Sequence, residues 1–161
     1  MKEVLIIYDS VFGNTKKISE AMFNALEPRM DVDLCIIGEV FPEHLDGVKY
    51  LLLGSPTRQF KETSAMNQFL KQIPKNGLNG IKYAAFDTRM TPDDVNKNRL
   101  LGLMVRLFGY AAEKISKQLG LLGGVEAVRP EGFYVVGMEG PLAEGELDRA
   151  AKWAMDAVIS G

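Results

Sequence analysis

The chain has 161 residues, of which 47% are hydrophobic and 25% are charged, and its formal net charge is −2. This length is sufficient for a substantial buried core, so we expect a single domain over residues 1–161. The nearly neutral charge gives no electrostatic argument for nucleic acid or a membrane as a partner.

Two scarce residue types exclude several kinds of site. Cys35 is the only cysteine and His44 the only histidine, which excludes an internal disulfide and any cysteine-based metal or iron–sulfur site. We therefore expect no metal. The chain starts without the features of a secretory signal, and no apolar run approaches the ~18 residues of a membrane span. Together these observations predict a cytoplasmic protein.

Short apolar runs alternate with helical patterns along the chain. Strands are expected at residues 4–8, 32–37, 50–53 and 81–86, followed by a fifth strand in two pieces at 125–128 and 133–136. Continuous apolar runs such as Val4 to Tyr8 are typical of strands that are buried on both faces of a parallel sheet.

Helices are expected between these strands, where apolar residues recur at a spacing of three or four. The first begins at Thr15 and ends before Pro28. The second is expected to bury Met66, Phe69, Leu70 and Ile73. A long helical pattern then joins Val105, Phe108, Ala112, Ile115 and Leu119. The last helix is expected to bury Leu147, Ala151, Ala154 and Val158.

Strands that alternate with helices predict right-handed crossovers, and hence a parallel sheet with helices on both faces. Five strands in a chain of this length fit a doubly wound α/β fold with the spatial order 2-1-3-4-5. In such sheets a ligand lies beyond the carboxyl ends of the strands, where the winding reverses. A site is therefore expected after Tyr8, Leu53 and Phe86.

The segment after the first strand has the features of an anion-binding turn. It directs backbone N–H groups and the positive end of a helix dipole at one point, and Gly13 permits close approach of the backbone. The segment contains no Lys or Arg and matches neither the dinucleotide nor the nucleoside-triphosphate glycine pattern. The candidate phosphate-binding residues are Ser10, Val11, Phe12, Gly13, Asn14 and Thr15. The alternative is that Ser10 and Thr15 only cap the helix.

Parts of the chain resemble one family of proteins. Tyr8 to Thr15 resembles the phosphate loop of flavodoxins, in the form found in flavodiiron proteins, where an aromatic such as Phe12 replaces the middle hydroxyl residue. Gly54 to Thr57 resembles the same group, and residues 140–147 resemble the entry to the last helix of some short flavodoxins. The resemblance implies a flavodoxin-like fold, a bound FMN and electron transfer between redox partner proteins.

The resemblance also implies that the second and third segments hold the isoalloxazine ring of the flavin. The corresponding residues are Pro56, Thr57, Arg58, Gln59 and Phe60 after the third strand, and Asp87, Thr88, Arg89 and Met90 after the fourth. Phe60 either stacks on the ring or anchors the following helix. Either arginine, if it lies near the flavin, would stabilise the reduced anion; the alternative is that both are solvated. No catalytic residue is expected, because the flavin supplies the chemistry.

The segment from Thr91 to Ala112 departs from the flavodoxin pattern, because it is apolar on more than one face. A helix that packs on a sheet needs only one apolar stripe. The surplus predicts a cover over the flavin or a contact surface. We expect a partner contact or a homodimer through residues 91–112.

Two other functions share this winding of the sheet. Response-regulator receivers need clustered carboxylates after the first strand and an aspartate after the third, whereas this chain has Asp9 alone and then Ser55 to Thr57. An FMN-dependent NAD(P)H:quinone-type oxidoreductase stays open as the alternative to an electron carrier. That enzyme would need a pocket over the flavin for nicotinamide and substrate.

Overall fold

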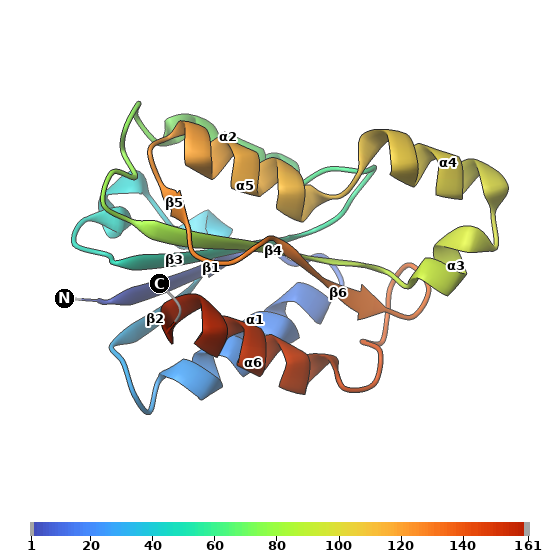
Figure 1. Ribbon diagram of the computed structural model, residues 1–161, viewed down its shortest axis with the longest axis horizontal. Helices are drawn as coiled ribbons and strands as arrows, with labels where there is room; N and C mark the ends of the chain where they lie inside the picture. The colour runs from blue at the N-terminus through green and yellow to red at the C-terminus, as the bar shows by residue number, and fades with distance from the viewer. Residues whose placement is uncertain (1, 160–161) are drawn as a thin grey trace.

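A parallel β-sheet forms the centre of the protein, and helices cover both of its faces (Figure 1). The computed structural model describes residues 2–159. The strands are β1 (Val4–Tyr8), β2 (Val32–Ile36), β3 (Tyr50–Pro56), β4 (Lys82–Met90), β5 (Val125–Glu126) and β6 (Glu131–Val135). Their order is β2-β1-β3-β4, with β5 and then β6 along the free edge of β4. The doubly wound order 2-1-3-4-5 and the fifth strand in two pieces are therefore confirmed.

The helices form two layers and one outlying group. On one face of the sheet lie α1 (Asn14–Leu26) and α6 (Glu146–Ile159); on the other lie α2 (Ser64–Gln72) and α5 (Ala111–Leu121). Two further helices, α3 (Pro92–Asn96) and α4 (Arg99–Phe108), extend beyond the carboxyl ends of the strands, on the right of Figure 1. Two short 3₁₀ turns, Ile37–Glu39 and Pro42–Leu45, follow β2. Within residues 2–159, no helix is long and apolar enough to cross a membrane.

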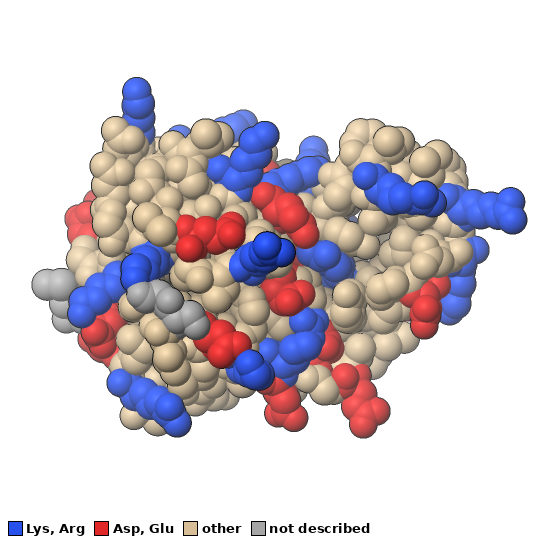
Figure 2. All heavy atoms as spheres, in the orientation of Figure 1, with Lys and Arg blue, Asp and Glu red and all other residues tan. Residues whose placement is uncertain are grey.

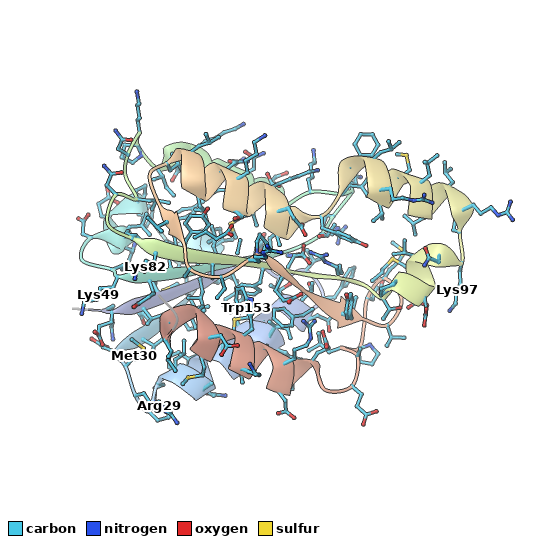
Figure 3. All side chains as sticks on the ribbon, viewed as in Figure 1. Arg29, Met30, Lys49, Lys82, Lys97 and Trp153 are labelled. Atoms are coloured by element: carbon cyan, nitrogen blue, oxygen red, sulfur yellow. The ribbon has the colours of Figure 1, made fainter. Side chains whose placement is uncertain are left out.

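The apolar core is divided by the sheet into two clusters. All five residues of β1 are buried, as a central strand covered on both faces requires. On the α6 face, the rings of Phe86, Phe133 and Trp153 pack edge to face, with centroids 5.8–6.2 Å apart (Figure 3). Gly54 makes room for this cluster, because a Cβ atom there would lie 2.1 Å from the Phe86 ring.

The fourth strand is longer than its apolar run predicts. Asp87, Thr88, Arg89 and Met90 were expected in a loop, but they belong to β4. They pair with β6 over Phe86–Met90, and Asp87 and Thr88 also pair with the end of β3. Polar side chains are tolerated in this central strand because each has a partner: Asp87 binds Arg89, and the Thr88 hydroxyl binds Thr15. The expected loop was therefore wrong in this part of the chain.

The long helical pattern before β5 is two helices, not one. It is interrupted at Gly109, whose φ of +71° lies in the left-handed region that favours glycine. Ala112, Ile115 and Leu119 are buried on α5 as predicted, whereas Val105 and Phe108 lie on α4, which has no buried residue. The regular spacing across Gly109 concealed the break between α4 and α5.

The buried face of the last helix is formed largely by alanines. Ala150, Ala154, Ala157 and Val158 face the core, whereas Leu147, which was predicted to be buried, is 46% exposed. The small side chains allow α6 to pack closely beside α1. The prediction for Ala154 and Val158 is confirmed, and that for Leu147 is wrong.

Candidate functional site

Three adjoining cavities lie at the carboxyl ends of β1, β3 and β4. They have volumes of about 40, 290 and 300 Å³, and all three share Thr57 and Met138 in their walls. Of the residues predicted to form a site, all but Ser10, Gly13 and Asp87 line at least one of these cavities. The topology therefore brings the three predicted segments together at one edge of the sheet.

The N-terminus of α1 presents open hydrogen-bond donors at this edge. Within residues 2–159, no oxygen accepts from the backbone N–H groups of Val11, Phe12, Asn14 or Thr15. Asn14 and Thr15 are nevertheless 8% and 1% exposed, and the first turn of α1 carries no acidic residue. Buried donors without acceptors are costly, and together with the helix dipole they favour an anion. This donor set fits a phosphate group.

The shape of the turn depends on Ser10 and Gly13. The Ser10 hydroxyl oxygen accepts from the N–H groups of Gly13, at 3.1 Å, and Lys16, at 3.3 Å. Gly13 has a φ of +89°, a conformation that strains any residue with a Cβ atom. Ser10 therefore holds the turn from within, while the neighbouring N–H groups stay open.

A loop near the end of the chain, which the sequence did not indicate as part of a site, supports the same turn. The Asn14 side chain donates to the Glu139 carbonyl at 2.8 Å, across 125 positions of sequence. Gly140 packs on the same amide: a Cβ atom at this residue would lie 2.7 Å from the Asn14 nitrogen. Met138 projects beside these residues into all three cavities and is 79% exposed. The glycine was the one signal in the sequence for this close approach.

The segment after β3 forms a strained tight turn. Arg58 and Lys61 exchange two backbone hydrogen bonds, at 2.8 and 3.1 Å, around Gln59 and Phe60. These two central residues have φ values of +49° and +65°, which are ordinarily adopted by glycine or asparagine. Left-handed backbone costs about 1–2 kcal/mol per residue. The turn is stabilised by Lys114, whose amine donates to the Phe60 carbonyl.

The two arginines of the predicted site have different surroundings. Arg58 lies over the ring of Phe12, with its guanidinium carbon 5.5 Å from the ring centroid, in the walls of two cavities. Arg89 forms a bidentate ion pair with Asp87, at 2.7 and 2.8 Å, and stacks on Tyr110 at 3.8 Å. The charge of Arg89 is therefore balanced by Asp87, whereas that of Arg58 is directed toward the cavities.

Asp87 is buried behind the cavities and has a structural role there. Its side chain is fully buried, and burial raises the pKa of its carboxyl, although the Arg89 guanidinium acts in the opposite direction. One carboxylate oxygen accepts from the Ala112 N–H at 2.9 Å, and the Thr57 hydroxyl accepts from the Ala111 N–H at 3.0 Å. These two contacts cap the start of α5. Asp87 thus does not line the cavities, unlike the other residues expected from β4.

The cavity of 300 Å³ lies between the β3 turn and the outlying helices. Its walls are largely apolar and comprise Thr57, Gln59, Phe60, Met90, Val95, Leu101, Val105, Tyr110 and Met138. Phe60 also contacts Phe108 of α4, with ring centroids 5.9 Å apart. An apolar space with a few polar groups at its rim is the usual form of a site for a planar organic molecule.

Asp94 joins α3 to the loop that carries Met138. Its carboxylate accepts from Lys97 at 2.8 Å and from the Gly137 N–H at 2.8 Å, and these bonds lower the pKa of Asp94 to about 2. A pKa below the ordinary value of 3.8 means that Asp94 stabilises the fold above pH 4 and that this contribution is lost as the pH falls toward 2.

We expect the carboxyl of Asp94 to titrate in the folded protein with a midpoint near 2. Carbon-detected NMR of the side-chain carboxyl measures this directly. Between pH 4 and pH 2, Asp94→Asn is expected to lose less unfolding free energy than the wild type, because its side chain does not titrate. Equal pH dependence of the two proteins in urea would contradict the assignment.

Comparisons with known proteins agree with this fold. A family model described as a flavodoxin domain matches residues 5–158. Flavodoxin 1 from Bacillus cereus superposes with a TM-score of 0.75 at 14% identity, over 96% of each chain. A flavodoxin from the Archaea gives 0.68 at 20% identity, over 96% of this chain and 94% of that chain. Comparison with curated proteins finds no match.

A larger protein contains the same fold as one part. Rubredoxin oxygen:oxidoreductase from Desulfovibrio gigas superposes with a TM-score of 0.71 at 16% identity. The match covers 98% of this chain but 35% of that protein. At such identities these likenesses concern the fold.

Proposed function

We propose, from the premise that this chain belongs to the flavodoxin family, that it binds FMN at the carboxyl ends of β1, β3 and β4 and transfers electrons. The observation that carries the proposal is the group of open N–H donors at the start of α1, beside cavities large enough for a ring system. FMN has one phosphate and one planar ring, which matches this combination. When bound, FMN supplies one- and two-electron chemistry.

Different residues of the chain would bind the phosphate and the ring of FMN. The N–H groups of residues 11, 12, 14 and 15 would hold the phosphate oxygens, and the turn that carries them contains no Lys or Arg. Phe60, Met90 and Met138 would cover the ring and exclude water from it. Arg58 is the cation best placed to stabilise a reduced, anionic flavin, because Arg89 is already paired with Asp87. The donor and acceptor of the electrons would be redox partner proteins.

An absorbance spectrum tests the proposal most directly. The purified protein, incubated with FMN and then desalted, is expected to be yellow and to hold about one FMN per chain. Flavin fluorescence is expected to fall as FMN binds, since side chains stack against the ring. A protein that stays colourless and leaves the fluorescence of FMN unchanged would refute FMN binding.

One observation supports a reductase as a second candidate function. With the ring in the cavity of 290 Å³, the adjoining apolar cavity between Phe60 and α4 would leave space for an organic substrate. Under this alternative the protein is an FMN-dependent NAD(P)H:quinone-type oxidoreductase. Steady oxidation of NADH or NADPH in the presence of a soluble quinone would identify the enzyme. A single reduction of the flavin without turnover would identify the carrier.

A further inference from the structure

The outer side of α4 is an apolar surface that no described residue covers. Leu100, Leu103 and Leu107 are 67%, 48% and 66% exposed. None of the residues of α4 is buried, and the helix stands away from the sheet beside α3 (Figure 1). Three large apolar side chains on one side of an exposed helix indicate an interaction surface.

The two sides of α4 are apolar for different reasons. At about 100° per residue, Leu100, Leu103 and Leu107 fall within about 60° of one another. Leu101 and Val105 lie on the opposite side and line the cavity of 300 Å³. The inner side therefore belongs to the candidate site, and the outer leucines have no role there.

Positive charge borders the outer leucines. Arg99 and Arg106 are seven residues apart, so they lie on one line along the helix, immediately beside Leu103. Neither arginine forms an ion pair with any residue between 2 and 159. Residues 95–112 contain no acidic residue, and Lys97 in this stretch is paired with Asp94. Lys and Arg side chains extend from this part of the molecule, on the right of Figure 2.

A second copy of the chain is a poor match for this surface. Two α4 helices placed face to face would bring four arginines together, with no carboxylate on either helix. An anionic partner is therefore favoured over self-association.

We propose that the outer face of α4 docks on the surface of an anionic lipid bilayer. Leu100, Leu103 and Leu107 enter the boundary between headgroups and acyl chains, while Arg99 and Arg106 reach lipid phosphates, as in interfacial amphipathic helices. The net charge of −2, from which no membrane contact was expected, conceals this local cluster. Because the other side of α4 lines the cavity, docking brings the cavity within about one helix diameter, ~10 Å, of the lipid.

Flotation with vesicles tests this docking and does not depend on FMN. We expect the apo and the FMN-loaded protein to float with vesicles of equal parts phosphatidylcholine and phosphatidylglycerol, and to stay unbound with phosphatidylcholine alone. Leu103→Glu/Leu107→Glu is expected to abolish flotation. Arg99→Gln/Arg106→Gln is expected to weaken it about 30-fold, since each basic residue contributes about 1 kcal/mol at an anionic surface.

A matched control separates docking from general stickiness. Leu121→Glu changes a leucine that is 75% exposed on α5, and is expected to float like the wild type. Flotation of the leucine pair variant at the wild-type level would overturn the proposal, as would absence of flotation with anionic vesicles. A dimer in light scattering that this variant dissociates would assign the surface to a second copy instead. FMN binding is measured separately, so its failure and the failure of docking are distinguishable.

Discussion

FMN is expected to bind this chain at least about 100-fold more tightly than riboflavin, which has the same ring but no phosphate. A hydrogen bond to a charged group contributes about 1.5–3 kcal/mol, so two such bonds from the open N–H groups of α1 account for this factor. Isothermal titration of the apo protein with each ligand measures the ratio. Similar affinities for the two ligands would show that the phosphate lies elsewhere.

The double variant Ser10→Ala/Thr15→Val is expected to lower the affinity for FMN at least tenfold and that for riboflavin no more than about twofold. Ser10 holds the turn, and the loss of the bond between Thr15 and Thr88 costs about 1 kcal/mol of stability. That stability loss affects both ligands alike, so the ratio of affinities is the readout. Ser64 is the control: its exposed hydroxyl lies at the start of α2, and the residue lines none of the three cavities. Ser64→Ala is therefore expected to change the affinity for neither FMN nor riboflavin. Equal losses for both ligands would contradict the proposed position of the phosphate.

Asp87→Ala is expected to destabilise the fold by about 3–5 kcal/mol, the usual effect of removing one partner from a buried ion pair. The Arg89 side chain, 12% exposed, would lose its buried counter-charge and keep only the exposed Glu113 at 3.5 Å, and the Ala112 N–H would lose its acceptor. Urea unfolding followed by circular dichroism measures the change. This loss of unfolding free energy is expected to exceed the loss caused by breaking any surface ion pair in the molecule.

Two further variants distinguish the buried pair from a general effect of charge. Asp156→Ala removes the partner of Lys152, both largely exposed, and is expected to change stability by less than about 0.5 kcal/mol. Asp87→Ala/Arg89→Met is expected to be more stable than Asp87→Ala, because no buried charge is left unpaired. A double variant as unstable as the single one would indicate that packing, not charge, dominates at this position.

The fold could be predicted because its central strands are apolar runs with clear ends. Val4 to Tyr8 and Leu51 to Leu53 are buried, and such runs are visible in the sequence without any knowledge of partners. The strand from Asp87 to Met90 could not be predicted in this way. Thr88 bonds to Thr15, Asp87 accepts from the Ala112 N–H, and the segment pairs with β6; these are contacts across the fold and have no local signal.

The candidate site, too, could be predicted where its residues are consecutive in the chain and not where they come together across the fold. The turn from Ser10 to Thr15 was predicted because its features are consecutive in the chain. The part played by Met138 and Glu139 was missed, because more than 120 residues separate them from the turn that they contact. The break at Gly109 was missed for another reason: apolar residues on α4 and α5 happen to keep helical spacing across it.

The capping of α5 has a consequence for the choice of ligand. Both α1 and α5 begin at the ligand edge of the sheet, but the first two N–H groups of α5 are already bonded to Thr57 and Asp87. A diphosphate would find donors for one of its phosphates at α1, whereas at α5 it would find the first two N–H groups already occupied. The edge is thus suited to a mononucleotide, and a dinucleotide such as FAD would gain nothing from its additional phosphate.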